Sequence, residues 1–203
     1  MLSIVLLCGM LFLSHTVMVI GVNINPHENR RKFFVQKIVD IVVVLVHFFT
    51  FVAFYNLLID DTVILTKKTI AFMTIVNVVS CCFNFYTFAS QIPWFKKNIR
   101  YMHGKEDKAM VIGIVVGLFF SIVEIYFSLF MVNSDWFVID ESIKNNALKT
   151  AFEFIYYTFS VTITYSGSGI ETIGIVPKIL QMMHVLFFYI FAGDTILQLI
   201  NKE

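Results

Sequence analysis

Five long apolar stretches dominate the sequence and limit the folds that the chain can adopt. They run from Met1 to about Val22, about Phe33 to Ile59, about Thr69 to Ile92, Met110 to Val132, and about Pro177 to Ile200. A helix needs about 20 predominantly apolar residues to cross the hydrocarbon core of a bilayer, and each stretch reaches that length. Only 14% of the residues are charged, whereas soluble domains carry about 25%. We therefore expect an all-α integral membrane protein with five transmembrane helices.

Basic residues gather in alternate connections between the apolar stretches. Ten of the fifteen lie in residues 23–37, in residues 93–108 and in the tail: Arg30, Arg31, Lys32, Lys37, Lys96, Lys97, Arg100, Lys105, Lys108 and Lys202. Because lysine and arginine are retained on the cytoplasmic side, we expect an outside N-terminus and a cytoplasmic C-terminus in the plasma membrane. The first stretch has no basic region before it, so we expect a retained helix rather than a signal peptide. The connection from Asn133 to Val176 then begins and ends outside.

No motif in the sequence points to catalysis or to a bound cofactor. The three cysteines lie inside apolar stretches, and their spacing suits neither a disulfide framework nor a metal site. The five histidines show no metal-ligand spacing and no obvious carboxylate companion. The net charge of +1 gives no reason to expect nucleic acid. We therefore expect no enzymatic activity, no cofactor and no soluble substrate, and we expect membrane lipid around the chain.

The outer connection has three parts. Residues 133–146 are polar and mildly acidic, as in an exposed turret, and residues 147–164 are apolar but too interrupted to cross a bilayer, so we expect a re-entrant or interfacial half-helix. A loop with the sequence Tyr-Ser-Gly-Ser-Gly (165–169) follows. Non-helical backbone cannot face lipid, because its polar groups would stay unpaired. Alternating glycines permit backbone angles of alternating sign, which turn carbonyl oxygens toward one axis, where they can replace the water around a cation.

This order of segments resembles the pore domain of the tetrameric potassium-channel-type superfamily of pore-loop cation channels. Its pore segment usually reads T-x-T-T-V-G-Y-G-D, and residues 162–170 read T-I-T-Y-S-G-S-G-I. The resemblance covers roughly residues 109–201. It implies a homotetramer in which residues 109–203 form the pore module and residues 1–108 form a three-helix peripheral region with a basic inner linker. It also implies a selectivity filter made of Thr164, Tyr165, Ser166, Gly167, Ser168 and Gly169.

The filter sequence departs from the family pattern at three positions. Tyr165 stands where the family usually has a threonine, Ser168 replaces a tyrosine that braces the filter, and Ile170 replaces an aspartate. The resemblance therefore implies a passive cation channel that conducts potassium or mixed monovalent cations (K⁺ or Na⁺), with no metal beyond these permeant ions. We expect Glu171 to add negative charge at the outer mouth and Asp194 at the inner mouth.

Two other functions remain open from the sequence. A small transporter subunit could use Glu124, Asp194 and His184 as a proton or ligand relay, because ionisable residues at membrane depth are functional candidates. A non-conducting regulatory subunit that keeps a degenerate pore loop would explain the three departures. Glu124 and Glu153 lie at overlapping depths, where we expect them to be protonated or bonded to neighbouring hydroxyl groups.

Overall fold

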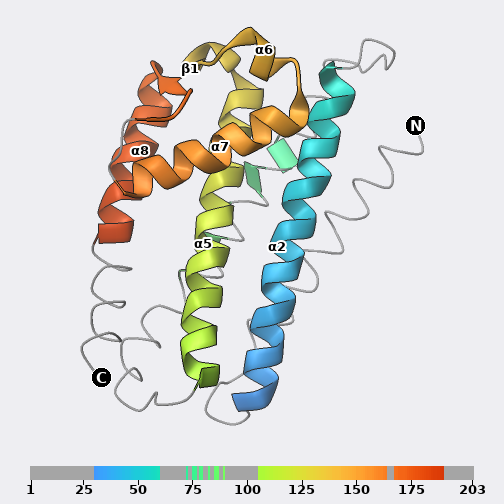
Figure 1. The fold of residues 1–203 in the computed structure, drawn as a ribbon, viewed down its shortest axis with the longest axis vertical. Coiled ribbons are helices and arrows are strands. Elements are labelled where there is room, and N and C mark those ends of the chain that lie inside the picture. Colours follow the sequence, from blue (N-terminus) through green and yellow to red (C-terminus); the bar gives the residue numbers. More distant parts are fainter. Residues whose placement is uncertain are drawn as a thin grey trace.

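The computed structural model describes residues 30–59, 105–163 and 167–189, together with single helical residues between 72 and 89. This part of the chain is mostly helical (Figure 1). Its helices are α2 (Arg30–Ile59), α5 (Lys105–Val132), the one-turn α6 (Glu141–Lys144), α7 (Ala147–Thr162) and α8 (Ile175–Phe187). A 3₁₀ turn, η2 (Ser134–Trp136), and two short strands, β1 (Phe137–Val138) and β2 (Glu171–Thr172), lie among them.

Helices α2 and α5 pack side by side and run in the same direction (Figure 1). The contacts between them show the direction, because later residues of one helix meet later residues of the other. The Phe48 ring lies 5.8 Å from that of Phe120, and the Tyr55 ring lies 5.7 Å from that of Phe130. Because α2 and α5 are parallel, the chain that connects them has to run back to the end of the bundle where α5 begins. The third span predicted from the sequence would supply this return.

Two helical segments are long and apolar enough to cross a membrane, namely Ile38–Ile59 in α2 and Val111–Val132 in α5, with 22 residues each. They confirm as helices the second and fourth predicted stretches. The described residues between 72 and 89 are also helical. The first predicted stretch lies outside the described residues, as does the end of the fifth, of which α8 covers the beginning.

A pair of two-residue strands at one end of the bundle is an addition to the helices that the sequence predicted, and the described part of the chain is mostly helical as expected for an all-α protein. β1 follows α5 after the 3₁₀ turn η2 and pairs antiparallel with β2, with Phe137 opposite Thr172 and Val138 opposite Glu171. The Trp136 carbonyl extends the ladder by accepting the backbone N–H groups of Ile173 at 3.0 Å and Gly174 at 3.3 Å. Strands of two residues are too short to show an alternating pattern, so no feature of the sequence predicts them.

Helix α7 lies across the ends of α2 and α5 that are nearest the strands and reaches toward α8 (Figure 1). Asn146 begins it by accepting the backbone N–H of Lys149 at 3.0 Å, which is an ordinary N-cap. The fully buried Phe154 anchors it, because its ring lies 5.3 to 5.5 Å from three other phenylalanine rings at this end of the bundle. Burying such a side chain contributes about 1.5–3 kcal/mol. The helix ends at Thr162, two residues earlier than predicted.

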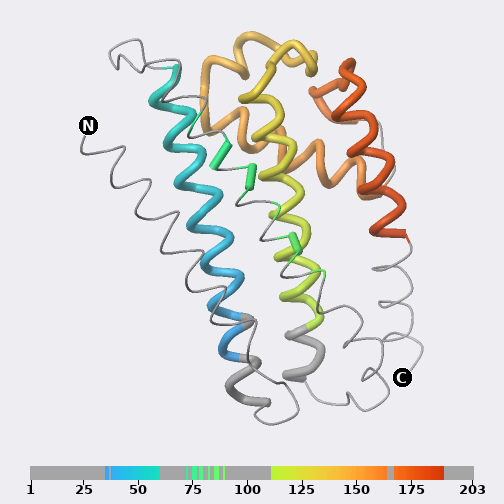
Figure 2. The backbone as a smooth tube through the Cα atoms, turned by 180° about the vertical axis from the view of Figure 1, so that it is seen from behind, coloured from blue at the N-terminus to red at the C-terminus, as the bar shows by residue number. Residues whose placement is uncertain are grey.

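Helix α8 starts beside the strands and runs back along α5 (Figure 2). Gly174 precedes it, and Pro177 occupies its first turn, where a backbone N–H would have no partner within the helix. The predicted division into residues 1–108 and 109–203 stays a prediction. Within the described residues, α2 from the first part shares one hydrophobic core with α5 and α7 from the second.

Candidate pore loop

The segment between β1 and β2 leaves the bundle and returns to it at the same end. β1 and β2 pair with each other, so residues 139 and 170 lie close to the C-terminal end of α5. Within this excursion α7 has 16 residues, which makes it about 24 Å long. Such a helix is too short to cross a bilayer core of about 30 Å. The geometry therefore fits a helix that lies within or along one leaflet.

The C-terminal end of α7 meets α8 and α5 at a buried histidine. The Thr162 hydroxyl lies 3.0 Å from His184 Nε2, and the Tyr126 hydroxyl lies 3.3 Å from His184 Nδ1. Tyr126 stands six residues before Val132, the last residue of α5, which is roughly 9 Å along the helix axis. The C-terminal end of α7 therefore lies well below the end of α5, beside its next-to-last turns.

The hydrogen bonds around His184 have a defined direction. The Thr162 hydroxyl donates its proton to the Thr158 carbonyl oxygen at 2.8 Å. The Thr162 oxygen is then left to accept a proton from His184 Nε2. A neutral imidazole has one donor and one acceptor nitrogen, so Nδ1 accepts the hydroxyl proton of Tyr126. His184 is 2% exposed, and this network joins α5, α7 and α8 in a neutral state of the ring.

The predicted filter is described only in its second half. Thr164, Tyr165 and Ser166 lie outside the described residues, while Gly167 and Gly169 are exposed and Ser168 is half-buried. Ser168 Oγ donates to the Ile170 carbonyl oxygen at 3.1 Å.

A close contact with Glu153, rather than a left-handed backbone conformation, explains why residue 169 is a glycine. Its φ lies outside the positive range, so it does not take the left-handed conformation expected from alternating glycines. A Cβ atom added at Gly169 would lie 3.3 Å from Glu153 Oε2, which is closer than nine in ten natural Cβ contacts. The carboxylate of Glu153 on α7 thus packs directly against the predicted filter loop, a placement that the sequence did not reveal.

The two predicted pore mouths are only partly described. Glu171 is exposed on β2, opposite Val138, and Asp194 lies outside the described residues. Ile170, which stands where the family has an aspartate, is buried at 4% exposure. The turret carries a further acidic side chain, Asp140, which caps α6. Hydrogen bonding by the Ser142 side chain and backbone N–H lowers the pKa of the Asp140 carboxyl below its ordinary value.

Glu124 makes a buried side-chain hydrogen bond that the sequence did not predict. Its Oε1 lies 3.0 Å from Nδ1 of His47 on α2, and both side chains are fully buried. The sequence showed no obvious carboxylate companion for any histidine, and this contact supplies one for His47. That Glu124 is protonated or bonded to a hydroxyl group stays a prediction. The partners are 77 residues apart in the sequence, and only the packing of α2 against α5 brings them together.

The transporter relay suggested by the sequence is not assembled in the described residues. Glu124 contacts His47, whereas His184 contacts Tyr126 and Thr162. Among the residues that the structure describes, no three His, Cys, Asp or Glu side chains gather where a metal ion could bind.

Comparison with known proteins gives no relative for this chain: no family model matches it, and neither a curated protein nor a solved structure is detectably similar to it.

Proposed function

We propose that the chain is one subunit of a homotetrameric passive cation channel in the plasma membrane, with its N-terminus outside and its C-terminus in the cytoplasm. The observation that carries the proposal is the excursion between β1 and β2. It consists of a turret, the short helix α7 and a return loop containing Gly167 and Gly169, and it begins and ends at one end of the bundle. This is the order of parts that a pore loop requires.

The chemistry of the loop favours a cation. A helix carries about half a negative charge at its C-terminal end, and the C-terminal end of α7 leads directly into the loop. Backbone carbonyl groups of residues 165–168 would replace the water around K⁺ or Na⁺, with Thr164 supporting them from the end of the helix. One chain supplies one such loop, so a closed ring of carbonyl oxygens needs several copies. Glu171 and Asp194 would place negative charge at the two mouths of the pore.

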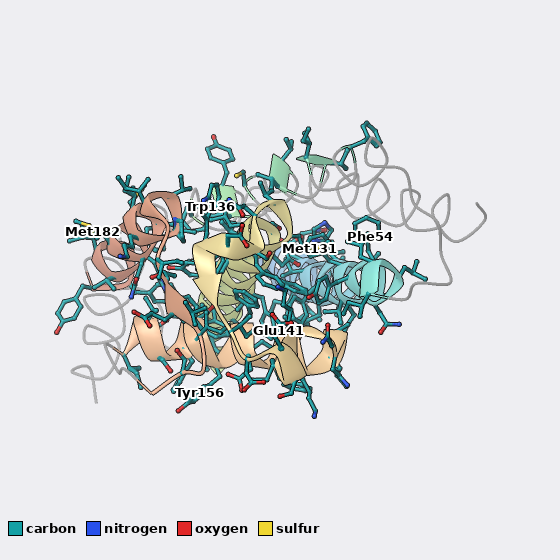
Figure 3. All side chains as sticks on the ribbon, turned by 90° about the horizontal axis from the view of Figure 1, so that it is seen from above. Phe54, Met131, Trp136, Glu141, Tyr156 and Met182 are labelled. Atoms are coloured by element: carbon teal, nitrogen blue, oxygen red, sulfur yellow. The ribbon has the colours of Figure 1, made fainter. Side chains whose placement is uncertain are left out.

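The outward face of α8 supports assembly or contact with lipid. Its apolar side chains are exposed in the single chain, and Met182, at 67% exposure, points away from the bundle (Figure 3). Ile179, Met183 and Leu186 are also more than half exposed. An apolar surface of this kind is not stable in water. In the proposed tetramer it would face neighbouring subunits, the pore or lipid.

Recording from the purified protein in planar bilayers under a potassium/sodium gradient tests conduction directly. The wild type should pass cation current, and Gly167→Ala and Gly169→Ala should abolish it while the protein still inserts. A wild type without current, or variants with unchanged current, would contradict the proposal.

Labelling of single cysteines tests the re-entrant course of the segment independently of conduction. In a variant whose three native cysteines are replaced, Ser142→Cys in the turret and Glu171→Cys on β2 should both react with a membrane-impermeant thiol reagent added outside. Lys105→Cys, at the opposite end of α5, should react only after the membrane is opened. Labelling of Ser142→Cys and Glu171→Cys from opposite sides would refute the excursion.

The buried His47 and Glu124 pair favours a carrier as the second candidate function. A titratable pair inside two apolar helices is costly and often marks a proton or substrate pathway in transporters. A cycling carrier moves ions much more slowly than a pore, so only the pore gives resolvable unitary currents. A proton gradient should drive uptake of a transported cation such as K⁺ or Na⁺ into liposomes if the protein is a carrier. Loss of this uptake in Glu124→Gln would support the carrier over the pore. The regulatory subunit would instead be silent alone and would alter the current of a conducting partner.

A further inference from the structure

His184 joins three helices at the C-terminal end of α7, where α7 reaches α8 (Figure 1). Its Nδ1 lies 3.3 Å from the hydroxyl of Tyr126 on α5, and its Nε2 lies 3.0 Å from the hydroxyl of Thr162 on α7. Thr162 is the last residue of α7, so this contact ties the end of the helix to α8 just before the predicted filter loop. Among the residues that the structure describes, no other side-chain hydrogen bond joins α7 to α8.

The immediate surroundings of His184 are uncharged. The polar groups that face it are the hydroxyls of Tyr126 and Thr162, and its ring packs on the ring of Phe188 in its own helix at 5.1 Å. The ring of Tyr157 on α7 packs on that of Tyr126 at 5.0 Å. In the described part of the chain, no carboxylate forms an ion pair with His184.

The charged side chains of the three helices are directed elsewhere within the described segments. Glu124 of α5 is bonded to His47 of α2, on the opposite side of α5 from this junction. Glu153 lies against the loop after α7, nine residues and about 14 Å before the end of that helix. Lys178 of α8 is exposed. A positive charge on His184 would therefore have no neighbour of opposite sign.

A second proton on the imidazole ring of His184 would disturb this junction. With a proton on each nitrogen the ring can only donate, so Nδ1 no longer accepts the hydroxyl proton of Tyr126. The ring also gains a charge, and a buried charge without a partner is costly. That cost falls when the end of α7 moves away and water reaches the ring. Thr162 is half-buried, so the junction lies near the surface of the bundle.

We infer that His184 is a positioning residue that holds the C-terminal end of α7 against α8 while its ring is neutral, and that protonation releases this end. The consequence for current rests on the proposed function, in which the end of α7 leads into the loop that faces the cation. Release would displace that loop, so protons would regulate conduction. The release itself requires no pore.

Amide hydrogen exchange of the full chain in detergent, followed by mass spectrometry, tests the release without any current. A histidine in water takes up a proton below about pH 6.5, so release that requires this proton should become up to about tenfold more frequent for each pH unit below that value. Between pH 8 and pH 5, exchange of the amides of residues 159–163 should therefore accelerate up to about thirtyfold beyond the chemical effect of pH. The amides of residues 150–154, which Phe154 anchors, should not accelerate.

His184→Gln is the matched variant, because an amide has a donor and an acceptor, as a neutral imidazole has, but does not titrate. The wild type is compared with His184→Gln at each pH, so the chemical effect of pH cancels. The two proteins should exchange alike at pH 8, and only the wild type should accelerate in acid. His47→Gln, the same change at a buried histidine bonded to Glu124, should keep the wild-type response. A ratio of wild type to His184→Gln that stays constant from pH 8 to pH 5 would overturn the inference.

Tyr126→Phe keeps the test decisive if His184→Gln disturbs packing. It removes only the hydroxyl that donates to Nδ1 of His184. Exchange of the amides of residues 159–163 should then become about fivefold faster at pH 8, the effect of losing one ordinary hydrogen bond. Unchanged exchange in Tyr126→Phe would also count against the inference, because the junction would not hold α7.

Conduction separates the release from the proposed function. The wild-type current should fall as the pH is lowered from 8 to 5, whereas His184→Gln should keep its current in acid. A wild type that passes no current but shows the expected exchange pattern would refute the channel and support the release. A conducting wild type whose current and exchange show the same pH dependence as those of His184→Gln would support the channel and refute the release.

Discussion

The buried pair of His47 and Glu124 should couple α2 to α5 energetically. Removing one partner of a buried hydrogen bond typically costs about 1–3 kcal/mol, because the other partner is left unsatisfied in an apolar environment. Both side chains are fully buried and 3.0 Å apart, so His47→Leu and Glu124→Met should each fall in this range. Glu124→Gln keeps an amide oxygen near the ring and should cost only about 1 kcal/mol.

The double variant distinguishes coupling from the sum of two separate losses. Replacing both partners of a buried pair by apolar residues is often close to neutral, so His47→Leu/Glu124→Met should unfold at a free energy nearer the wild type than either single variant. The assay is equilibrium unfolding of the purified protein in mixed micelles, followed by circular dichroism. We expect a coupling free energy of about 2 kcal/mol or more for residues in one buried pair, above the range found for independent sites.

A matched cycle provides the control. Ser121 is buried one turn from Glu124, but its hydroxyl donates to the Gly117 carbonyl of its own helix at 2.9 Å. Ser121→Ala combined with His47→Leu should therefore be additive within about 0.5 kcal/mol. Additive losses for His47→Leu and Glu124→Met would refute the claim that this pair joins the two helices.

Three smaller predictions concern the turret end of the bundle. A Cβ atom at Gly174 would lie 2.7 Å from the Trp136 ring, so Gly174→Ala should cost about 1–3 kcal/mol in the free energy of unfolding. The penalty should be smaller in a Trp136→Ala background, where only the 2.9 Å contact with the Cβ atom of residue 136 remains. His184→Leu removes the acceptor of the buried Tyr126 hydroxyl and the donor to the half-buried Thr162 hydroxyl, so it should lower this free energy by about 1–3 kcal/mol. An unchanged value would show that the network is not formed. The pKa of Asp140 is lowered by its bonds with Ser142, so its contribution is present above the ordinary value of about 4 and is lost as the pH falls through the lowered value. The midpoint temperature of thermal unfolding should therefore fall as the pH is lowered into the acid range. Asp140→Asn should make this fall smaller.

The features that the sequence predicted are those set by local pattern. Apolar length defined the helical segments Ile38–Ile59 and Val111–Val132, and no contact with another segment was needed to find them. The short helix α7 was also predictable, because polar residues precede it and a Gly-rich loop follows within 20 residues of its start. Only its end moved, from Thr164 to Thr162.

The features that the sequence missed depend on residues far apart in the chain. His47 and Glu124 are separated by 77 residues, and β1 pairs with a strand more than 30 residues later. The sequence showed ionisable residues inside two apolar stretches. The possibility that such residues pair across helices was the one available signal for this contact. The position of Glu153 against Gly169 had no such signal, because it depends on how the return loop folds over α7.

The distribution of hydrogen bonds separates the scaffold of this protein from its candidate site. Between α2 and α5, and where α5, α7 and α8 meet, the buried imidazole rings of His47 and His184 bond to side chains on neighbouring helices. On α7, by contrast, Glu153 Oε2 and Ser160 Oγ are buried and have no hydrogen-bond partner among the described residues, and the Glu153 carboxylate lies against Gly169 of the predicted filter loop. A buried polar group without a partner is costly, so a fold selected only for stability has no reason to leave these two atoms open. They lie on the helix that leads into the proposed pore loop, which is where a functional site can justify that cost.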